Sequence, residues 1–404
     1  MPASPSTALH PGLAIILLAL LLSIQPVTTD LYLPALPALT RDLAAPVAAA
    51  QLSLSGLLLA FGGTQLLWGP LSDRYGRRPI LLAGLAAYCA ASVACVAAPS
   101  MAWLIAWRVV QGAAMGAVVM TGRAIVRDLY LPLAGARAMS KALTGLGVVA
   151  CLSPLLGALL TEWLGWRAAL AALGVYALVT LGLIARYLPE TLLQRNPRAL
   201  QPAVLVRTWT QVLRHPTFWT FSLLTTASYG GLFTFLAASS FVFIDVLGLT
   251  RTQYGAALLS NAFAYLLGTL LCRRLLLRVG LRRTVAIGGL LSLCGGGLVA
   301  IVALLGWHKA WALLAPFYLF MLGHGIHQPC GQTGAVGPFP QAAGVASACN
   351  GCITMLVAFG IGRWVGAHLD GSVWPLVQGI GVSAVALAVI AWTLVPRFGE
   401  PQAA

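Results

Sequence analysis

Long apolar runs, separated by short polar or basic connections, dominate this chain from one end to the other. Each run holds about 20 residues, and a helix of that length crosses the hydrocarbon core of a bilayer because it rises ~1.5 Å per residue. The runs span approximately 12–33, 52–68, 80–98, 101–121, 142–160, 168–187, 218–241, 254–272, 284–305, 311–329, 345–365 and 374–394. The pattern predicts an all-α integral membrane protein with twelve transmembrane helices.

The composition supports a membrane location. Hydrophobic residues make up 59% of the chain and charged residues only 8%, whereas soluble domains carry roughly a quarter charged residues. The first run is longer than the ~7–15 residues of a signal-peptide core, and no basic segment precedes it. We therefore interpret it as the first transmembrane helix.

The runs divide into two sets of six around residues 189–216, a connection rich in Arg and Pro. This division predicts an N-terminal six-helix bundle at 1–188, a linker at 189–216 and a C-terminal six-helix bundle at 217–404. A basic, glycine-containing segment follows the second run, and a weaker copy without its Asp, Gly280–Arg283, follows the eighth. Two pseudo-symmetric halves of this kind are typical of transporters.

The net charge of +15 is unevenly distributed. With the N-terminus placed inside, eighteen of the 24 Lys and Arg residues fall in connections on the inner side and five in connections on the outer side. This bias predicts that both termini are cytoplasmic. It also accounts for the basic character of the chain, so nucleic acid is not an expected partner.

Asp30 is the only one of the nine acidic residues that lies inside an apolar run. A charge at the bilayer centre costs roughly 2.5–3.5 kcal/mol, so such a residue is expected to face a cavity or a partner. We expect Asp30 to bind and release a proton. The alternative is a hydrated carboxylate at the outer mouth, because Pro34 and Pro37 follow closely.

Arg108 is the only cation well inside a run. Counting residues from the outer surface places Asp30 and Arg108 at depths of roughly 6 and 10 Å. We therefore hypothesise an ion pair between them, direct or through water, that a proton or a substrate releases. The alternative is a structural hydrogen bond from Arg108 to carbonyl groups of the first helix.

A motif with an expected mechanical role follows the second run. It consists of Gly69, Asp73, Arg74, Gly76, Arg77 and Arg78. Its glycines allow close packing, and Asp73 is expected near a helix N-terminus. Arg77 and Arg78 are expected to pair with an acid on a neighbouring connection, for which Asp128 is the candidate. The pattern predicts a conformational latch, and the alternative is charge that only sets topology.

Polar and aromatic residues inside the runs are candidates for lining a substrate cavity. They are Gln25, Tyr32, Gln111, Tyr229, Phe233, Asn261, Tyr265, His324, His327 and Gln328. Such residues tend to face the interior of a bundle, and aromatic rings can grip flat apolar ligands. The alternative for each is helix packing. His324 and His327 share a helix face, but without acidic or Cys partners nearby they do not suggest a metal site.

Several segments resemble the major facilitator superfamily. The Gly69–Arg78 segment resembles its signature between spans two and three, and Trp107-Arg108-Val-Val-Gln111-Gly112 resembles its span-four motif. Ser153-Pro154-Leu-Leu-Gly157 looks like the antiporter motif of span five, a helix-packing motif, with Ser where Gly is usual. Further segments resemble the Bcr/CflA drug-resistance branch: Asp30–Ala35, Arg123–Asp128, Trp163–Arg167, Pro189–Thr191 and Ala343–Ala348.

The resemblance implies proton/drug antiport by rocking of two bundles in a bacterial inner membrane. Asp30 would be the proton-linked acid, Arg108 the relay arginine, and Asp73, Arg77 and Asp128 the latch. The expected partners are a small-molecule drug or metabolite, protons and the lipid bilayer, for a monomer that uses the proton gradient and no cofactor. The alternative is a specific metabolite transporter. An enzyme or a sensor is not expected, because no catalytic dyad or nucleotide-binding loop is present.

Overall fold

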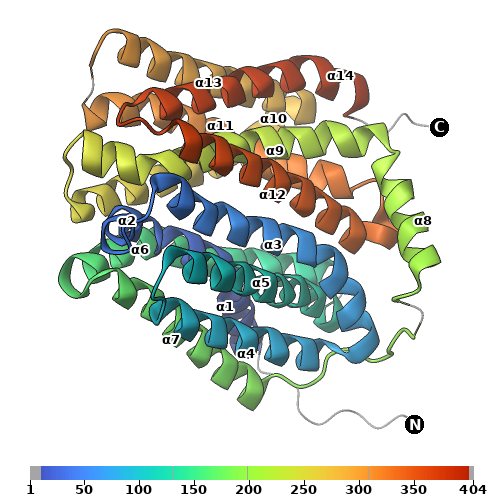
Figure 1. Ribbon diagram of the computed structural model, residues 1–404. Helices are drawn as coiled ribbons and strands as arrows, with labels where there is room; N and C mark the ends of the chain where they lie inside the picture. The colour runs from blue at the N-terminus through green and yellow to red at the C-terminus, as the bar shows by residue number, and fades with distance from the viewer. Residues whose placement is uncertain (1–10, 131, 198, 308, 400–404) are drawn as a thin grey trace, which may run out of the picture.

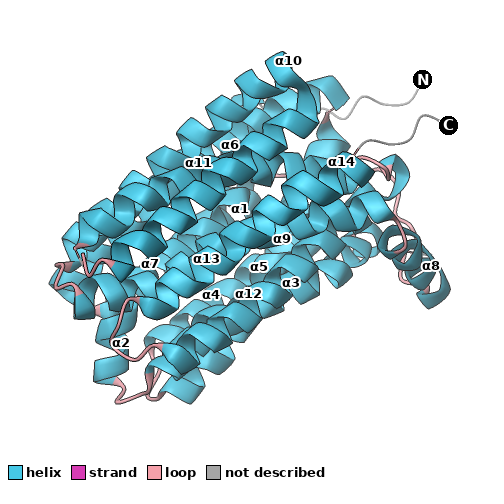
Figure 2. Cartoon of the chain, turned by 90° about the horizontal axis from the view of Figure 1, so that it is seen from above, coloured by secondary structure: helices cyan, strands magenta, loops and turns pink. Residues whose placement is uncertain are grey.

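The computed structural model describes residues 11–130, 132–197, 199–307 and 309–399, and every regular element in this part of the chain is helical (Figure 2). The N-terminal bundle contains α1 (Pro11–Asp30), η1 (Leu33–Ala35), α2 (Leu36–Asp42), α3 (Val47–Tyr75), α4 (Arg77–Val96), α5 (Met101–Leu129), α6 (Pro132–Leu164) and α7 (Trp166–Tyr187). The C-terminal bundle contains α9 (Pro216–Ser240), η2 (Phe241–Val246), α10 (Arg251–Leu304), α11 (Ala310–Val336), η3 (Pro340–Ala342), α12 (Ala343–His368), α13 (Trp374–Val389), η4 (Ile390–Leu394) and α14 (Val395–Phe398). Between them lies α8 (Pro202–Leu213).

The described chain contains twelve membrane-crossing segments, although only eleven separate helices are long and apolar enough to cross a membrane. The difference arises in α10, whose 54 residues include both the eighth and the ninth expected spans. Gly280 breaks this helix with φ 77° and ψ 175°, a backbone conformation that glycine adopts without steric penalty. The expected loop between these spans is therefore reduced to a single non-helical residue, and the all-α membrane fold is confirmed.

The two bundles lie side by side, and α3 and α12 run together along the boundary between them (Figure 1). Small residues allow this close approach: Gly62 of α3 lies against Met355 of α12, and Gly362 of α12 lies against Ser55 of α3. A second contact between the bundles brings Gly255 of α10 against α6. Helices in membranes associate through packing of this kind, because lipid is as apolar as their side chains.

The connections alternate between the two ends of the bundles. Arg167, in the first turn of α7, donates to Oδ2 of Asp42 at 2.9 Å and to the carbonyl oxygen of Ala98 at 3.4 Å. Asp42 ends α2 and Ala98 lies between α4 and α5, so three connections meet at this end, which we call the Asp42 end. The opposite end, called the Gly76 end, holds Gly76 and Glu190. Figure 1 shows α8 on the side away from α2, and α14 reaches the same side.

The first expected span is interrupted in the structure. Its helix α1 ends at Asp30, and the chain continues through η1 into α2. Asp30 is therefore the last residue of α1 rather than a residue about four positions inside the end of a span. Asp30 thus stands at the C-terminus of α1, where the last carbonyl groups have no partners within the helix.

Candidate functional site

Asp30 lies half-buried between the bundles. Its Oδ1 accepts a hydrogen bond from Oγ1 of Thr29 at 2.7 Å. Among the described residues, no Lys, Arg or His nitrogen lies within 4.0 Å of this carboxylate. The short helix η1, which follows Asp30 closely, packs against α9 and α10 of the C-terminal bundle. Asp30 therefore belongs to the N-terminal bundle and lies close to the C-terminal one.

Arg108 does not pair with Asp30. Its guanidinium is fully buried, with Nη1 donating to Oε1 of Gln111 at 2.7 Å and Nη2 donating to the carbonyl oxygen of Thr28 at 3.3 Å. The ring of Tyr32 lies 4.2 Å from its central carbon. The direct form of the expected ion pair is thus not observed between these described residues, whereas the alternative contact with a carbonyl of the first helix is. Helix C-terminal carbonyls and an aromatic face supply the negative potential that a carboxylate would otherwise provide.

Two residues expected to line a cavity belong instead to the surroundings of Arg108. The hydroxyl group of Tyr32 hydrogen-bonds to Oγ of Ser53 at 2.7 Å, and Nε2 of Gln111 donates to Oγ of Ser92 at 2.8 Å. Tyr32 and Gln111 are fully buried. Their polar atoms satisfy the interior of the N-terminal bundle, so the structure does not place them on a substrate path.

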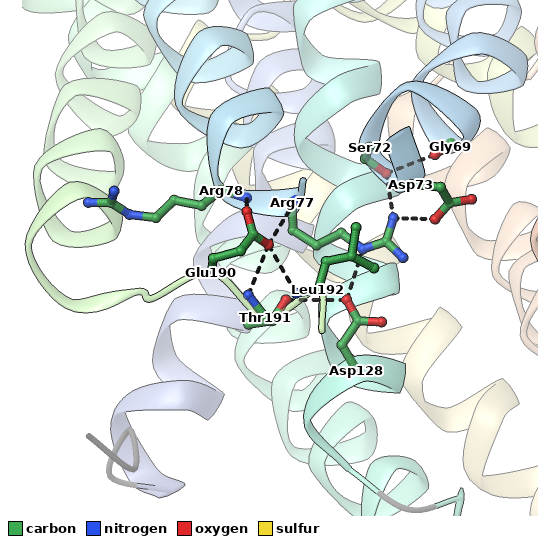
Figure 3. Close-up of polar contacts among 9 residues, drawn as sticks. All are labelled: Gly69, Ser72, Asp73, Arg77, Arg78, Asp128, Glu190, Thr191 and Leu192. Carbon is green, nitrogen blue, oxygen red and sulfur yellow. Dashed lines mark hydrogen bonds and ion pairs between the residues drawn. The ribbon is translucent and has the colours of Figure 1, made fainter. Parts of the chain in front are cut away.

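Arg77 stands at the centre of the expected latch (Figure 3). Its Nη1 lies 2.6 Å from Oδ1 of Asp73, and its Nε donates to Oδ2 of Asp128 at 2.8 Å. Nη1 also donates to Oγ of Ser72 at 2.6 Å. The guanidinium is buried, and charge-assisted hydrogen bonds of this length are the strong class. The structure therefore brings together the three residues that the motif singled out.

Glu190 completes this cluster and was not expected from the sequence. It accepts hydrogen bonds from the backbone nitrogens of Arg77 at 3.0 Å and Arg78 at 3.2 Å, at the N-terminus of α4 (Figure 3). The expected acid at a helix N-terminus is thus Glu190 rather than Asp73. The guanidinium of Arg78 donates to the carbonyl of Ala185 at 2.9 Å, not to an acid as expected. The sequence offered one signal for this role of Glu190, because the residue comes directly after the sixth span, on the same side of the membrane as the motif.

The whole cluster lies within the N-terminal bundle. Asp73 belongs to α3, Arg77 to α4 and Asp128 to α5, and Glu190 follows α7. The contacts therefore fasten four helices of one bundle and do not join the two bundles. Arg74, also in the motif, is exposed and lies over the ring of Tyr75 instead.

The glycines and the span-five motif act through close packing. Gly76 has φ 108°, a backbone conformation that favours glycine. A Cβ added at Gly69 would lie 4.0 Å from the side chain of Met120. Gly157 lies so close to Leu31 that a Cβ there would overlap the carbonyl oxygen of Leu31. Ser153 donates to the carbonyl of Val149 at 2.7 Å, and the carbonyl of Pro154 faces Gly255 of α10. This motif therefore lies where α6 meets both α1 and α10.

The remaining cavity candidates come from both bundles, with Gln25 in the N-terminal bundle and the others in the C-terminal one. Tyr229 and Phe233 stack with ring centres 6.2 Å apart. His324 Nδ1 lies 2.8 Å from Oγ of Ser228, and the Tyr265 ring is 5.4 Å from that of His324. The others are Gln25, half-buried in α1; Asn261, buried with neither side-chain polar atom paired; His327, with Nε2 3.3 Å from the carbonyl of Val285; and Gln328, accepting from Gln332 at 3.4 Å. Ring contacts join Tyr229 to Phe233 and Tyr265 to His324.

Polar contacts between the bundles are concentrated at the Asp42 end. Nη1 of Arg41 lies 3.8 Å from Oδ1 of Asp245, and Nη1 of Arg251 donates to the carbonyl of Thr161 at 3.4 Å. Oγ1 of Thr252 also hydrogen-bonds to the carboxylate of Glu162. In this structure, side-chain links therefore hold the bundles together at the Asp42 end.

Comparisons with known proteins agree with this architecture. Residues 18–362 match the Major Facilitator Superfamily. The chain is 29% identical to the chloramphenicol resistance protein of Pseudomonas aeruginosa, over 86% of this chain and 82% of that protein. It is 30% identical to multidrug resistance protein D of Escherichia coli, over 83% and 84%. The crystal structure of a D-xylose-proton symporter superposes with a TM-score of 0.71 at 16% identity, covering 97% of this chain and 99% of that one.

Proposed function

Because this chain belongs to the major facilitator superfamily, we propose that it exports small amphipathic drugs across a bacterial inner membrane in exchange for protons. The names of its relatives, which denote chloramphenicol and multidrug resistance, support the substrate class. The excess of Arg on the connections at the Gly76 end supports a cytoplasmic location for that end. The proposed energy source is the proton gradient, with no bound cofactor and a single chain as the working unit.

The observation that carries the proposal is the position of Asp30. Its carboxylate is half-buried and has no cation within 4.0 Å among the described residues, so no fixed positive charge competes there with a proton. The carboxylate also lies close to the other bundle, because η1, which follows it, packs against α9 and α10. Its charge therefore acts at the boundary that opens and closes during alternating access, and a change in its protonation can favour one arrangement of the bundles.

Arg108 and the Arg77 cluster have supporting roles in this scheme. By holding the carbonyl of Thr28, Arg108 fixes the last turn of α1 and hence the place of Asp30. The Arg77 cluster joins α3, α4 and α5, so the N-terminal bundle can rotate as one body. We propose that this cluster keeps the bundle rigid during rocking.

Proton coupling is tested with inverted membrane vesicles that have an acidified lumen, monitored by a pH-sensitive fluorescent dye. Adding chloramphenicol should release protons from vesicles with the wild-type protein and from vesicles with Asp370→Asn, a matched change at an exposed carboxylate. Vesicles with Asp30→Asn should release none above the protein-free background. Full drug-induced proton release by Asp30→Asn would disprove the coupling role.

The substrate class is tested by growth of a host that lacks its own drug pumps. Expression should protect such cells against several chemically unlike toxins. Protection against one compound or none would favour a specific metabolite transporter. This assay does not depend on the mechanism of coupling, so the two parts of the proposal can fail separately.

A further inference from the structure

Arg123 is a second arginine inside the membrane-spanning part of α5. It lies in the span Met101–Val126, and its side chain is half-buried. Its Nη1 donates to Oγ of Ser347 in α12 at 3.4 Å, a contact that crosses from the N-terminal to the C-terminal bundle. The sequence position of Arg123 suggested that it lies in a connection. In the structure its guanidinium lies at the boundary between the two bundles, which we call the seam.

This guanidinium has no counter-ion in the described part of the chain. No described carboxylate lies within 4.0 Å of it, and the acid nearest along α5, Asp128, is bound to Arg77. An arginine carries five N–H donors, and the described residues accept from Arg123 only through Ser347. A charge without a partner in a membrane span is unfavourable, and such residues mark places where substrates or ions pass.

The facing surface of α12 adds further polar groups. Asn350 lies one turn after Ser347, and residues three apart share a helix face. Its Oδ1 is buried without a hydrogen-bond partner in the described structure. The seam therefore holds the guanidinium of Arg123 and the hydroxyl group of Ser347, both of which can donate to an anionic oxygen. Beside them lies the amide oxygen of Asn350, an acceptor that lacks a donor.

We propose that Arg123 and Ser347 bind an anionic carboxylate group of the transported compound, with Oδ1 of Asn350 accepting from a neighbouring N–H or O–H of that compound. This inference rests on the proposed export function and adds a recognition element to it. A guanidinium matches the planar geometry of a carboxylate with two parallel hydrogen bonds. The predicted ligands are thus organic acids or drugs that carry an acidic group.

This site is separate from the proton site. Gly122, adjacent to Arg123, lies against Leu21 of α1. Leu21 precedes Asp30 by nine residues, which corresponds to about 13 Å along a helix. Binding of an acid at Arg123 should therefore not require the carboxylate of Asp30.

Calorimetric titration of the full chain in phosphatidylcholine nanodiscs tests the proposal, with 1-naphthoate as the acidic probe and 1-naphthamide as its neutral counterpart. Arg123→Gln should weaken naphthoate binding at least tenfold and leave naphthamide binding unchanged. Arg123→Lys should retain part of the preference, because it keeps the charge but loses the planar fork. Ser347→Ala should cause a smaller loss, about threefold, and Arg186→Gln, an exposed arginine of the same bundle, should cause none.

Equal affinity of wild type and Arg123→Gln for naphthoate, with Arg123→Lys also unchanged, would overturn the proposal. A fall in wild-type naphthoate affinity as anionic phosphatidylglycerol is added, absent in Arg123→Gln, would instead assign the site to lipid phosphate and also overturn it. Asp30→Asn should bind naphthoate as wild type does. That result would hold even if proton coupling failed, so failure of this inference is distinguishable from failure of the proposed function.

Discussion

Nη2 of Arg108 donates to the carbonyl oxygen of Thr28 across 3.3 Å, so α5 is tied to the turn of α1 that ends at Asp30. The carbonyl that Arg108 binds belongs to the residue two positions before Asp30, yet the side chains of Arg108 and Asp30 do not form a direct ion pair. Arg108 therefore acts on Asp30 through the position of the helix end. The partial negative charge of that helix end makes the contact favourable.

A double-mutant cycle distinguishes this role from a direct ion pair. Arg108→Gln should lower the free energy of unfolding by about 2–3 kcal/mol, because the carbonyl of Thr28 and the amide of Gln111 lose a charged donor. Asp30→Asn should have little effect on stability. In the double mutant the two changes should add within ~0.5 kcal/mol. A coupling energy well above that, measured by chemical denaturation in micelles, would show that the two charges interact directly.

The proposed coupling predicts that drug affinity depends on pH through protonation of Asp30. In the proposed antiport, protons and drug compete, so wild-type affinity for chloramphenicol should rise as pH increases and the carboxylate loses its proton. Asp30→Asn cannot lose a proton, and its affinity should stay constant over the same pH range. Drug affinity measured by equilibrium titration over roughly pH 5.5–8.5, a range in which buried carboxyl groups can titrate, would check this. A parallel rise in both proteins would assign the effect to another group.

The Arg77 cluster should tolerate no replacement of its central residue. Arg77→Lys keeps the charge but cannot contact Asp73, Asp128 and Ser72 together, because lysine has a single donor nitrogen. We expect a loss of about 1–3 kcal/mol in stability and a matching fall in drug resistance. Thermal unfolding of purified protein measures the first. Glu190→Gln, which keeps one of the two acceptor oxygens, should lose about 1 kcal/mol.

Arg74→Lys is the matched control for these variants, because Arg74 is exposed and makes none of the cluster's hydrogen bonds. It should unfold at the wild-type temperature. Wild-type stability in Arg77→Lys would mean that the cluster does not fasten the bundle.

Close packing of α6 against α1 should limit what residue 157 can be. Gly157→Ala would place a methyl group on the carbonyl oxygen of Leu31, next to Asp30, so the helices must separate. We expect a lower unfolding temperature and reduced transport, since overpacking typically costs about 1–3 kcal/mol. Gly182→Ala, where nothing lies within 4 Å of the added group, is the control. It should be as stable as wild type or slightly more stable, because alanine favours helix.

The ion pair of Arg41 and Asp245 should influence which end of the bundles is open. Its side chains are 65% and 41% exposed, so breaking it with Asp245→Asn should shift the equilibrium by no more than ~1 kcal/mol. The charge-reversed Asp245→Arg should open the Asp42 end further through repulsion, and adding Arg41→Asp should restore closure. Labelling of a single cysteine placed at Ala38 by a water-soluble maleimide would report these changes. Equal labelling in all variants would exclude a gating role.

The sequence determined the number of membrane segments, the six-and-six division of the apolar runs and the isolation of Asp30. Each of these depends on properties that a helix carries by itself. A helix in lipid must satisfy its own backbone groups and must be long and apolar enough to cross. The pairing of Arg77 with Asp128 could also be predicted, because few acids were available on the correct side.

The tertiary structure decided the partners of Arg108, the capping role of Glu190 and the place of Arg123 at the seam. These depend on the rotation and depth of each helix relative to its neighbours, within a few ångströms. Almost uniformly apolar helices carry little information about rotation, because lipid and protein interior accept the same side chains. The contacts that fix rotation are close approaches at glycines such as Gly112 and Gly157, whose partners lie far away in sequence.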